Sequence, residues 1–290
     1  MNKLKVHWIL LRPFATLGLI PPFLLGLFLA GGTNHLLLPA MAFIGSTFIL
    51  YASHYHNSYS DYIRGVDTIE TTAVKGYTLA STILPQGLIS ETEVKLVAAI
   101  LYLLGCVCWL FVICNTSILS MIPFTLGMLC AIAYNEIGKY RGWGEILMAL
   151  SFGLSITLAG YIPIANTLTW ETLIVALIPG MLWGLFYTMD QYQDSQNDMK
   201  CGIVNLAIKF IEYHFPISRY LEFGFFTVLI LHIYLILIGI LPAQTFISIA
   251  ATPIAFLAIL SADTNPKKSG MLLLFAYGLY VLLMDLGFLI

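Results

Sequence analysis

The chain has 290 residues, of which 59% are hydrophobic and only 10% charged, and its mean hydropathy is +0.89. No soluble domain of this size has such a composition, and repeated apolar runs of about 20 residues are typical of membrane spans. The formal net charge is −2 and the sequence has no basic patch, so it gives no indication of nucleic-acid binding.

The apolar segments predict nine transmembrane helices in a single polytopic membrane domain over residues 1–290. Their expected ranges are 14–30, 36–57, 95–114, 117–135, 145–165, 171–190, 220–241, 243–262 and 269–289. The fold class is therefore predicted to be an all-α membrane protein, with nine helices around a central cavity.

Polar segments follow the second, fourth and sixth spans, and we expect them to form loops that cap one face of the domain. These loops cover residues 62–94, 136–144 and 191–219. Long loops within a compact domain usually act as lids or binding segments.

The basic residues predict the orientation of the chain in the membrane. All 13 Lys and Arg fall at the N-terminus or in the loops after spans 2, 4, 6 and 8, and none falls on the other side. Because basic residues are enriched in cytoplasmic loops, the N-terminus and the cap loops are expected in the cytoplasm and the C-terminus outside.

Two acidic clusters lie at the ends of the second and sixth spans. Their sequences are Asn57-Ser-Tyr-Ser-Asp61-Tyr-Ile-Arg64-Gly-Val-Asp67 and Asp190-Gln-Tyr-Gln-Asp194-Ser-Gln-Asn-Asp198. A carboxylate near a bilayer is costly unless it is paired or binds a metal, so each cluster indicates a functional site. Within each cluster the i, i+4 spacing forms a stripe on one helical face, and three aspartates drift only about 80° over two turns.

Oxygen ligands arranged in this way suit a hard cation such as Mg²⁺. If the two stripes face each other, their side chains can hold two or three ions. The predicted metal ligands are Asn57, Asp61, Asp67, Asp190, Asp194 and Asp198.

The charge balance of the two clusters indicates a phosphate-bearing substrate. Five aspartates and a diphosphate carry more negative charge than two Mg²⁺ ions neutralise, so further cations are required to bind the phosphoryl groups. The candidates on the same side are Arg64, Lys75, Lys139, Arg141 and Lys200. The rest of the site is apolar helix, which suits the hydrocarbon tail of a prenyl diphosphate.

Tyr134 and Tyr187 are further candidates for substrate binding. Their rings could stabilise a carbocation through cation–π contacts. Tyrosine is also enriched at membrane interfaces, and the sequence leaves both interpretations open.

The two motifs, with the Gly-Val-Asp-Thr and Gly-Ile-Val-Asn-Leu-Ala segments that follow them, resemble the UbiA superfamily of membrane prenyltransferases. The segment Lys139-Tyr-Arg-Gly-Trp-Gly-Glu145 is similar to the loop after helix 4 in the menaquinone-pathway branch, which includes the dihydroxynaphthoate prenyltransferases. Arg12-Pro13 and the segment 86–90 also match that branch, and the resemblance covers residues 8 to 210 by motif.

The resemblance implies a lateral-opening cavity, binding of Mg²⁺–diphosphate, and transfer of a polyprenyl group to an aromatic acceptor. It places Asn57, Asp61, Asp67, Asp194 and Asp198 at the metal-site positions, and Lys139 and Arg141 in the basic loop. We expect Asp61, Asp194 and Lys139 to be the catalytic residues.

The sequence departs from the family pattern near these motifs. Gln193 and Met199 stand where arginines are common, which removes positive charge around the diphosphate. Tyr134 and Lys139 are five residues apart, whereas the family usually has four.

Two other functions are compatible with the sequence. A UbiA-type terpene cyclase would use the same metal site without an acceptor. An ion-coupled transporter would use intramembrane carboxylates, but such sites usually lie at the midplane of the membrane rather than at one end.

Overall fold

The computed structural model of the chain describes residues 2–32, 36–68 and 79–290. Within these ranges the chain forms helices and no strand. Nine helical segments there are long and apolar enough to cross a membrane, which confirms the predicted fold class and number of spans. The spans are Lys3–Leu29, Leu37–Ile63, Glu91–Asn115, Ile118–Arg141, Gly144–Ala165, Trp170–Lys200, Ile217–Leu237, Ala243–Ser261 and Pro266–Gly287.

Several spans are built from more than one helical element. The first consists of α1, a 3₁₀ segment η1 and α2, and two spans contain π-helical turns, η3 and η4. In chain order the elements are α1 (Lys3–Leu11), η1 (Pro13–Gly18), α2 (Ile20–Leu29), α3 (Leu37–Ile63), α5 (Leu79–Ile83), α6 (Glu91–Asn115), η2 (Ile118–Ser120), α7 (Met121–Ala133), η3 (Tyr134–Gly138), α8 (Lys139–Arg141), α9 (Gly144–Ala149), η4 (Leu150–Ser155), α10 (Ile156–Ala165), α11 (Trp170–Lys200), α12 (Leu206–Glu212), α13 (Ile217–Leu237), η5 (Ala243–Ala251), α14 (Thr252–Ser261) and α15 (Pro266–Gly287).

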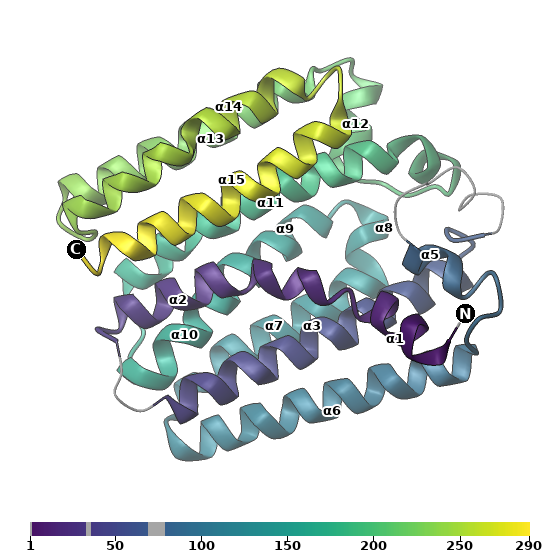
Figure 1. Cartoon of the computed structure of the whole chain (residues 1–290), viewed down its shortest axis with the longest axis horizontal. Helices are drawn as coiled ribbons and strands as arrows, with labels where there is room; N and C mark the ends of the chain where they lie inside the picture. Colours follow the sequence, from purple (N-terminus) through teal and green to yellow (C-terminus); the bar gives the residue numbers. More distant parts are fainter. Residues whose placement is uncertain (1, 33–35, 69–78) are drawn as a thin grey trace.

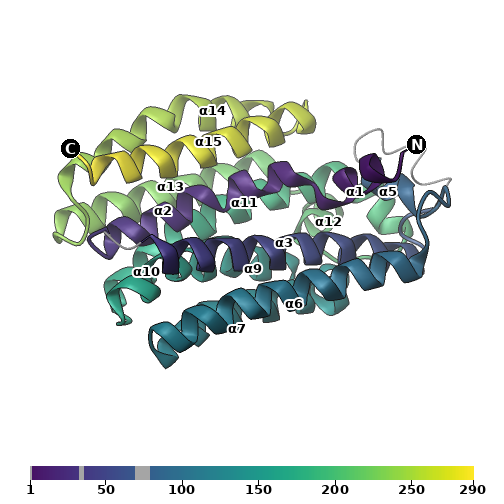
Figure 2. The ribbon, with the colours of Figure 1, turned by 60° about the horizontal axis from the view of Figure 1, so that its bottom comes forward.

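The helices run side by side in an elongated bundle, with the two ends of the chain at opposite ends (Figure 1). Helices α13, α14 and α15 group together on one flank, and α6 packs along α3 on the other (Figures 1 and 2). The span formed by α11 is the most buried of the nine, and the span from α9 to α10 is next. The core of the bundle therefore lies around α11.

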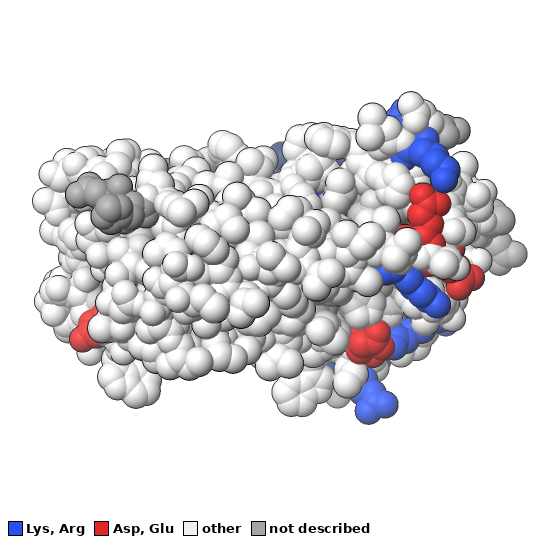
Figure 3. Space-filling model, turned by 90° about the horizontal axis from the view of Figure 1, so that it is seen from below, with Lys and Arg blue, Asp and Glu red and all other residues white. Residues whose placement is uncertain are grey.

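Charged side chains on the face shown in Figure 3 gather at the end of the bundle that carries the N-terminus, and a single acidic group is visible at the other end. Most of the long flank between the two ends is white in this view (Figure 3). Helix α6 exposes apolar residues such as Leu103 and Leu110. This surface suits contact with lipid tails, because lipid offers nothing to solvate a charge. The chain is thus a multi-pass integral membrane protein, and its orientation in the membrane stays a prediction.

The two helices that carry the acidic motifs, α3 and α11, end in similar turns. Gly65 follows α3 with φ +71° and Gly202 follows α11 with φ +70°, a left-handed conformation that glycine adopts without a steric penalty. Each turn then delivers an apolar side chain, Val66 or Ile203, to one small buried cluster with Ile208. This cluster joins the ends of the two motif helices.

All three predicted cap loops contain helical residues, and in the 62–94 segment these include α5 and the start of α6. Helix α11 continues to Lys200, so the first ten residues of the 191–219 segment are helical, and α12 lies within the remainder. The 136–144 segment consists mostly of the π turn η3 and α8. Hydropathy marks where the membrane ends, whereas a helix continues until a breaker such as Gly202 stops it.

Helices α2 and α10 pack against each other with their backbones close together. A Cβ added to Gly160 would overlap the backbone oxygen of Phe23, and one added to Gly26 would overlap that of Thr157. We expect Gly160→Ala to destabilise the protein by about 1 to 3 kcal/mol, because a backbone carbonyl cannot rotate away.

Thermal unfolding in detergent measures this effect. Gly278→Ala in α15 is the matched control, because its Cβ would meet nothing within 4 Å, and its Tm should stay the same or rise. Equal Tm values for Gly160→Ala and the unchanged protein would contradict the close crossing.

Candidate active site

A cavity of about 940 Å³ lies between the first span, α3, α7, the α9–η4 segment, α11 and α15. Its polar lining comes from the ends of α3 and α11, the end of the fourth span and the junction of α1 and η1. The charged and amide side chains in this lining are Arg12, Asn57, Asp61, Asp67, Lys139, Asp190, Gln191, Gln193 and Asp194. The rest of the lining is largely apolar, so the cavity has one polar end.

Five of the six predicted metal ligands line this cavity. Asn57 and Asp61 are buried on one face of α3, and the turn at Gly65 brings the buried Asp67 back to the same cavity. The backbone N–H groups of Val66 and Asp67 both donate to the backbone oxygen of Asp61, which fixes this return.

Asp190 and Asp194 face the cavity from α11, but Asp198 does not line it. Asp198 is only 3% exposed, and its carboxylate accepts a hydrogen bond from Asn205 Nδ2 at 3.3 Å, just before α12. The drift of about 80° from Asp190 to Asp198 is enough to turn the third carboxylate off the cavity face. The structure thus places Asp198 where it anchors the start of α12.

Asp61 forms a buried ion pair with Lys139. Lys139 Nζ donates to Asp61 Oδ2 at 2.6 Å, and the two side chains are 10% and 6% exposed. The Tyr140 hydroxyl donates to the other oxygen, Oδ1, at 2.7 Å. A buried carboxylate needs such partners, because an unpaired charge in a low-dielectric site is very costly.

The π turn η3 explains how Tyr134 and Lys139 reach the same cavity although they are five residues apart. The backbone N–H of Lys139 bonds to the carbonyl of Tyr134, the i to i+5 pattern of a π-helix. Both side chains line the cavity, and the Tyr134 hydroxyl lies 2.8 Å from that of Tyr187 on α11. Both predicted tyrosines therefore face the cavity.

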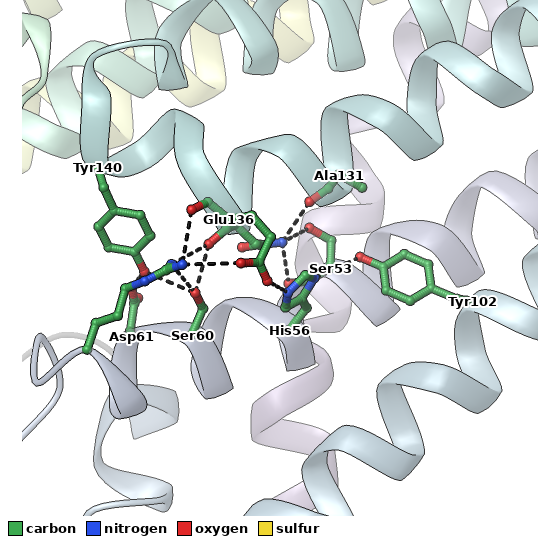
Figure 4. A network of polar contacts seen from close by, with 10 residues as sticks. Ser53, His56, Ser60, Asp61, Tyr102, Ala131, Glu136 and Tyr140 are labelled. Atoms are coloured by element: carbon green, nitrogen blue, oxygen red, sulfur yellow. Dashed lines mark hydrogen bonds and ion pairs between the residues drawn. The ribbon is translucent and has the colours of Figure 1, made fainter.

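Arg64, a predicted substrate ligand, does not line the cavity and instead bonds to Glu136, which belongs to the polar network in Figure 4. Its guanidinium donates to the backbone oxygens of Asn135 and Glu136, at 2.9 and 3.0 Å, and pairs with the Glu136 carboxylate at 3.2 Å. The same carboxylate lies 2.7 Å from His56 Nε2. Both backbone oxygens belong to the π turn η3, so the turn provides the acceptors that hold the Arg64 guanidinium.

Two further predicted cations, Arg141 and Lys200, also lie outside the cavity lining. Arg141 and Lys200 are exposed and do not line it, because each is the last residue of its helix and extends from the end of the bundle. Lys75 lies outside the residues that the structure describes.

Sequence reasoning did not assign a site role to Arg12, which lines the polar end of the cavity. Its Nε is buried and, in the described part of the chain, has no hydrogen-bond partner. Its backbone is left-handed, with φ 49°, a strained conformation that is often found at functional sites. The Arg12-Pro13 interruption of an apolar span was the only signal in the sequence.

The described residues do not gather three or more His, Cys, Asp or Glu side chains into a preformed metal cage. Mg²⁺ is usually held by one or two carboxylates together with substrate phosphates and waters, so it needs no such cage. The unpartnered donors Asn57 Nδ2 and Arg12 Nε fit an anion at the same end of the cavity. The donor set therefore fits an ion that binds together with a diphosphate.

Aromatic rings line the middle of the cavity. Trp183 of α11 stacks on Phe152 with ring centroids 3.7 Å apart, and Tyr277 meets it edge-on at 5.0 Å. On one side, the lining includes exposed apolar residues of η1 and α15, such as Leu17 and Phe275. The cavity therefore reaches the lipid-facing surface between η1 and α15.

The fold and the sequence both match known proteins. The chain is 29% identical over 238 residues to the 4-hydroxybenzoate octaprenyltransferase of Aliivibrio fischeri, covering 79% of this chain and 77% of that protein. It is 26% identical to the 1,4-dihydroxy-2-naphthoate octaprenyltransferase of Bacillus subtilis, over 70% of this chain and 65% of that protein.

A solved UbiA homologue from Archaeoglobus fulgidus, bound to DMAPP and Mg²⁺, has the same fold. The two structures align with a TM-score of 0.66 over 96% of this chain and 98% of that chain, at 17% identity. The UbiA prenyltransferase family model matches residues 19–283. Because this match covers most of the chain, the protein belongs to the UbiA prenyltransferase family.

Proposed function

We propose that this prenyltransferase moves a polyprenyl group from its diphosphate to an aromatic acceptor in a Mg²⁺-dependent reaction. The observation that carries the proposal is the cavity of about 940 Å³, which has acidic and basic side chains at one end and is largely apolar along the rest. An amphiphilic substrate with a diphosphate head and a hydrocarbon tail fits both parts. The family membership supports an enzyme rather than the ion-coupled transporter.

At the polar end, Asn57 and Asp61 of α3 would hold Mg²⁺ from one side, together with Asp67 in the turn after α3, and Asp190 and Asp194 of α11 from the other. When bound, Mg²⁺ would stabilise negative charge on the departing diphosphate as a Lewis acid. The homologue from Archaeoglobus fulgidus, which binds DMAPP and Mg²⁺, supports this assignment.

Lys139 and Arg12 are the cations of this chain that face the same end of the cavity among its described residues. Preorganised positive charge aimed at a leaving group lowers the barrier to breaking the allylic C–O bond. Arg12 can thus supply part of the charge that is missing where Gln193 and Met199 replace the usual arginines.

The walls of the cavity would protect the reactive allylic carbon. The apolar and aromatic side chains around Trp183 and Phe152 exclude water, which would otherwise quench a carbocation. The opening between η1 and α15 allows a long tail to extend into the lipid. An electron-rich carbon of the acceptor then forms the new C–C bond, and the ring proton is lost to a base.

The acceptor is proposed to be a hydroxylated aromatic acid of the benzoate or naphthoate class. The names of the relatives from Aliivibrio fischeri and Bacillus subtilis specify 4-hydroxybenzoate and 1,4-dihydroxy-2-naphthoate, respectively. The paired hydroxyls of Tyr134 and Tyr187 face the cavity near Lys139 and provide hydrogen-bonding groups for such a ring. We further propose that this polar end faces the cytoplasm, as the distribution of basic residues indicates.

Product analysis tests the reaction directly. We expect purified protein with Mg²⁺ and labelled C10 to C20 prenyl diphosphates to release diphosphate when a naphthoate or benzoate acceptor is present, and to yield a prenylated aromatic product. A cyclic hydrocarbon formed without any acceptor would instead indicate the terpene cyclase, for which the aromatic group around Trp183 would stabilise the migrating cation.

Asp61→Ala and Asp194→Ala are each expected to reduce Mg²⁺-dependent diphosphate release by at least about 100-fold, because each removes a charged ligand from one side of the site. Asp263→Ala is the matched control: this exposed aspartate accepts from the backbone N–H of Ser218 at 3.4 Å, away from the cavity. Full activity of either cavity variant would refute the site assignment.

Arg12→Gln is expected to raise the KM for the prenyl diphosphate about tenfold or more, because a charged donor to an anion is lost. The backbone strain at this position is the same for both side chains, so the substitution isolates the charge. Arg12→Lys should give an intermediate KM, since it keeps the charge but not the planar guanidinium. Arg219→Gln, at an exposed pair with Glu222, is the control, and identical kinetics for all of these variants would argue against a role for Arg12.

A further inference from the structure

The two oxygens of Asp61 have partners of different kinds on consecutive residues. Oδ2 accepts from the ammonium of Lys139, a side chain that lines the cavity. Oδ1 accepts from the Tyr140 hydroxyl, and Tyr140 does not line the cavity. One oxygen therefore has a partner on the substrate side, and the other has a partner in the protein wall.

The π turn makes this double contact possible. In an uninterrupted α-helix, residues five apart point about 140° away from each other, so Tyr134 and Lys139 could not both face the cavity. The bond from the Lys139 N–H to the Tyr134 carbonyl removes this offset. Tyr140 then follows at the next position and reaches Asp61 from the side.

Tyr140 is itself held in place by its surroundings. The Arg64 guanidinium lies over its ring at 4.2 Å from the centroid, a cation–π contact. Arg64 is fixed in turn by the Glu136 carboxylate and by two carbonyls of the π turn (Figure 4). The ring also packs against the cluster of Val66, Ile203 and Ile208 that joins the ends of α3 and α11.

We propose that Tyr140 is a permanent partner of Asp61 and that Lys139 is an exchangeable one, so that Lys139 couples metal binding to diphosphate binding. The inference rests on the proposed function for the identity of the incoming ligand. A metal ion that takes Oδ2 must displace the ammonium, and a buried ammonium without an anion is very costly. A diphosphate that arrives with the metal gives Lys139 a new partner, so the two ligands bind together better than either binds alone.

Tyr140 has a different task in this scheme. Its hydroxyl orients the carboxylate and leaves Oδ2 toward the cavity, as outer hydrogen bonds do for metal-binding carboxylates. Removing the hydroxyl should weaken metal binding whether or not a diphosphate is present. Lys139 and Tyr140 thus have opposite effects on the metal alone, which a merely structural role would not produce.

Mn²⁺ binding, followed by electron paramagnetic resonance on the full-length protein in nanodiscs, tests the proposal without catalysis. Titrations are made with and without methylenediphosphonate as the diphosphate probe. We expect the probe to strengthen Mn²⁺ binding to the unchanged protein. In Lys139→Met, Mn²⁺ alone should bind about tenfold more tightly, and the probe should strengthen Mn²⁺ binding about tenfold less than it does in the unchanged protein, because the competing ammonium is gone.

In Tyr140→Phe, Mn²⁺ should bind about tenfold more weakly under both conditions, with the effect of the probe retained. Arg64→Lys should also weaken Mn²⁺ binding, but by less than Tyr140→Phe does, since it loosens the cation–π contact with the Tyr140 ring. Tyr102→Phe is the matched control, because its hydroxyl lies 3.4 Å from His56 at the edge of the network and does not contact Asp61. Its titrations should match those of the unchanged protein.

Each other outcome has a definite meaning. Equal weakening of Mn²⁺ binding in Lys139→Met and Tyr140→Phe would overturn the exchange and leave both residues with a structural role. If Lys139→Met does not fold, Lys139→Arg should retain the effect of the probe, and its loss there would also overturn the proposal. If the unchanged protein binds no Mn²⁺ even with the probe, the proposed function itself fails, whereas intact coupling in Lys139→Met refutes this inference alone.

Discussion

The need to pair the carboxylates at the end of an apolar cavity controls the arrangement of the whole site. An ionised aspartate that is 6% exposed among membrane helices is tolerated only with close partners, and Asp61 obtains them from Lys139 and Tyr140. Both partners depend on the π turn at the end of the fourth span, and Arg64 bonds to carbonyls of that turn. The Asp61–Lys139 and Arg64–Glu136 ion pairs therefore link the acidic motif of α3 to the fourth span.

The second motif is brought to the same place by helix ends rather than by charges. Matching left-handed glycines after α3 and α11 send Val66 and Ile203 into one cluster, against which Tyr140 packs. Burial of this apolar cluster thus holds together the ends of α3 and α11, whose aspartates would repel each other. Farther into the cavity, Trp183 and its aromatic neighbours form an apolar wall. The side of the cavity between η1 and α15 reaches the lipid-facing surface.

The sequence alone was sufficient for the nine spans, because hydropathy over about 20 residues is a local property. It was also sufficient to bring Asn57, Asp61, Asp190 and Asp194 to one cavity, since i, i+4 spacing survives in any helix. It failed for Asp198, because the drift of the stripe around α11 turns this side chain away from the cavity. It failed for Arg64 because the guanidinium bonds to carbonyls of the π turn η3. A hydropathy pattern does not predict where a π turn forms. Arg12 and Tyr140 were missed because one depends on a strained backbone and the other on a contact between distant spans.

The most direct measurement is a structure of the protein with Mn²⁺ and a non-cleavable prenyl thiodiphosphate, with the metal located by its anomalous scattering. The account predicts metal peaks between Asp61 of α3 and Asp194 of α11, the hydrocarbon tail against Trp183, and Lys139 Nζ on a phosphate oxygen while Tyr140 stays on Asp61. Metal peaks elsewhere, or a diphosphate bound away from both aspartates, would contradict it.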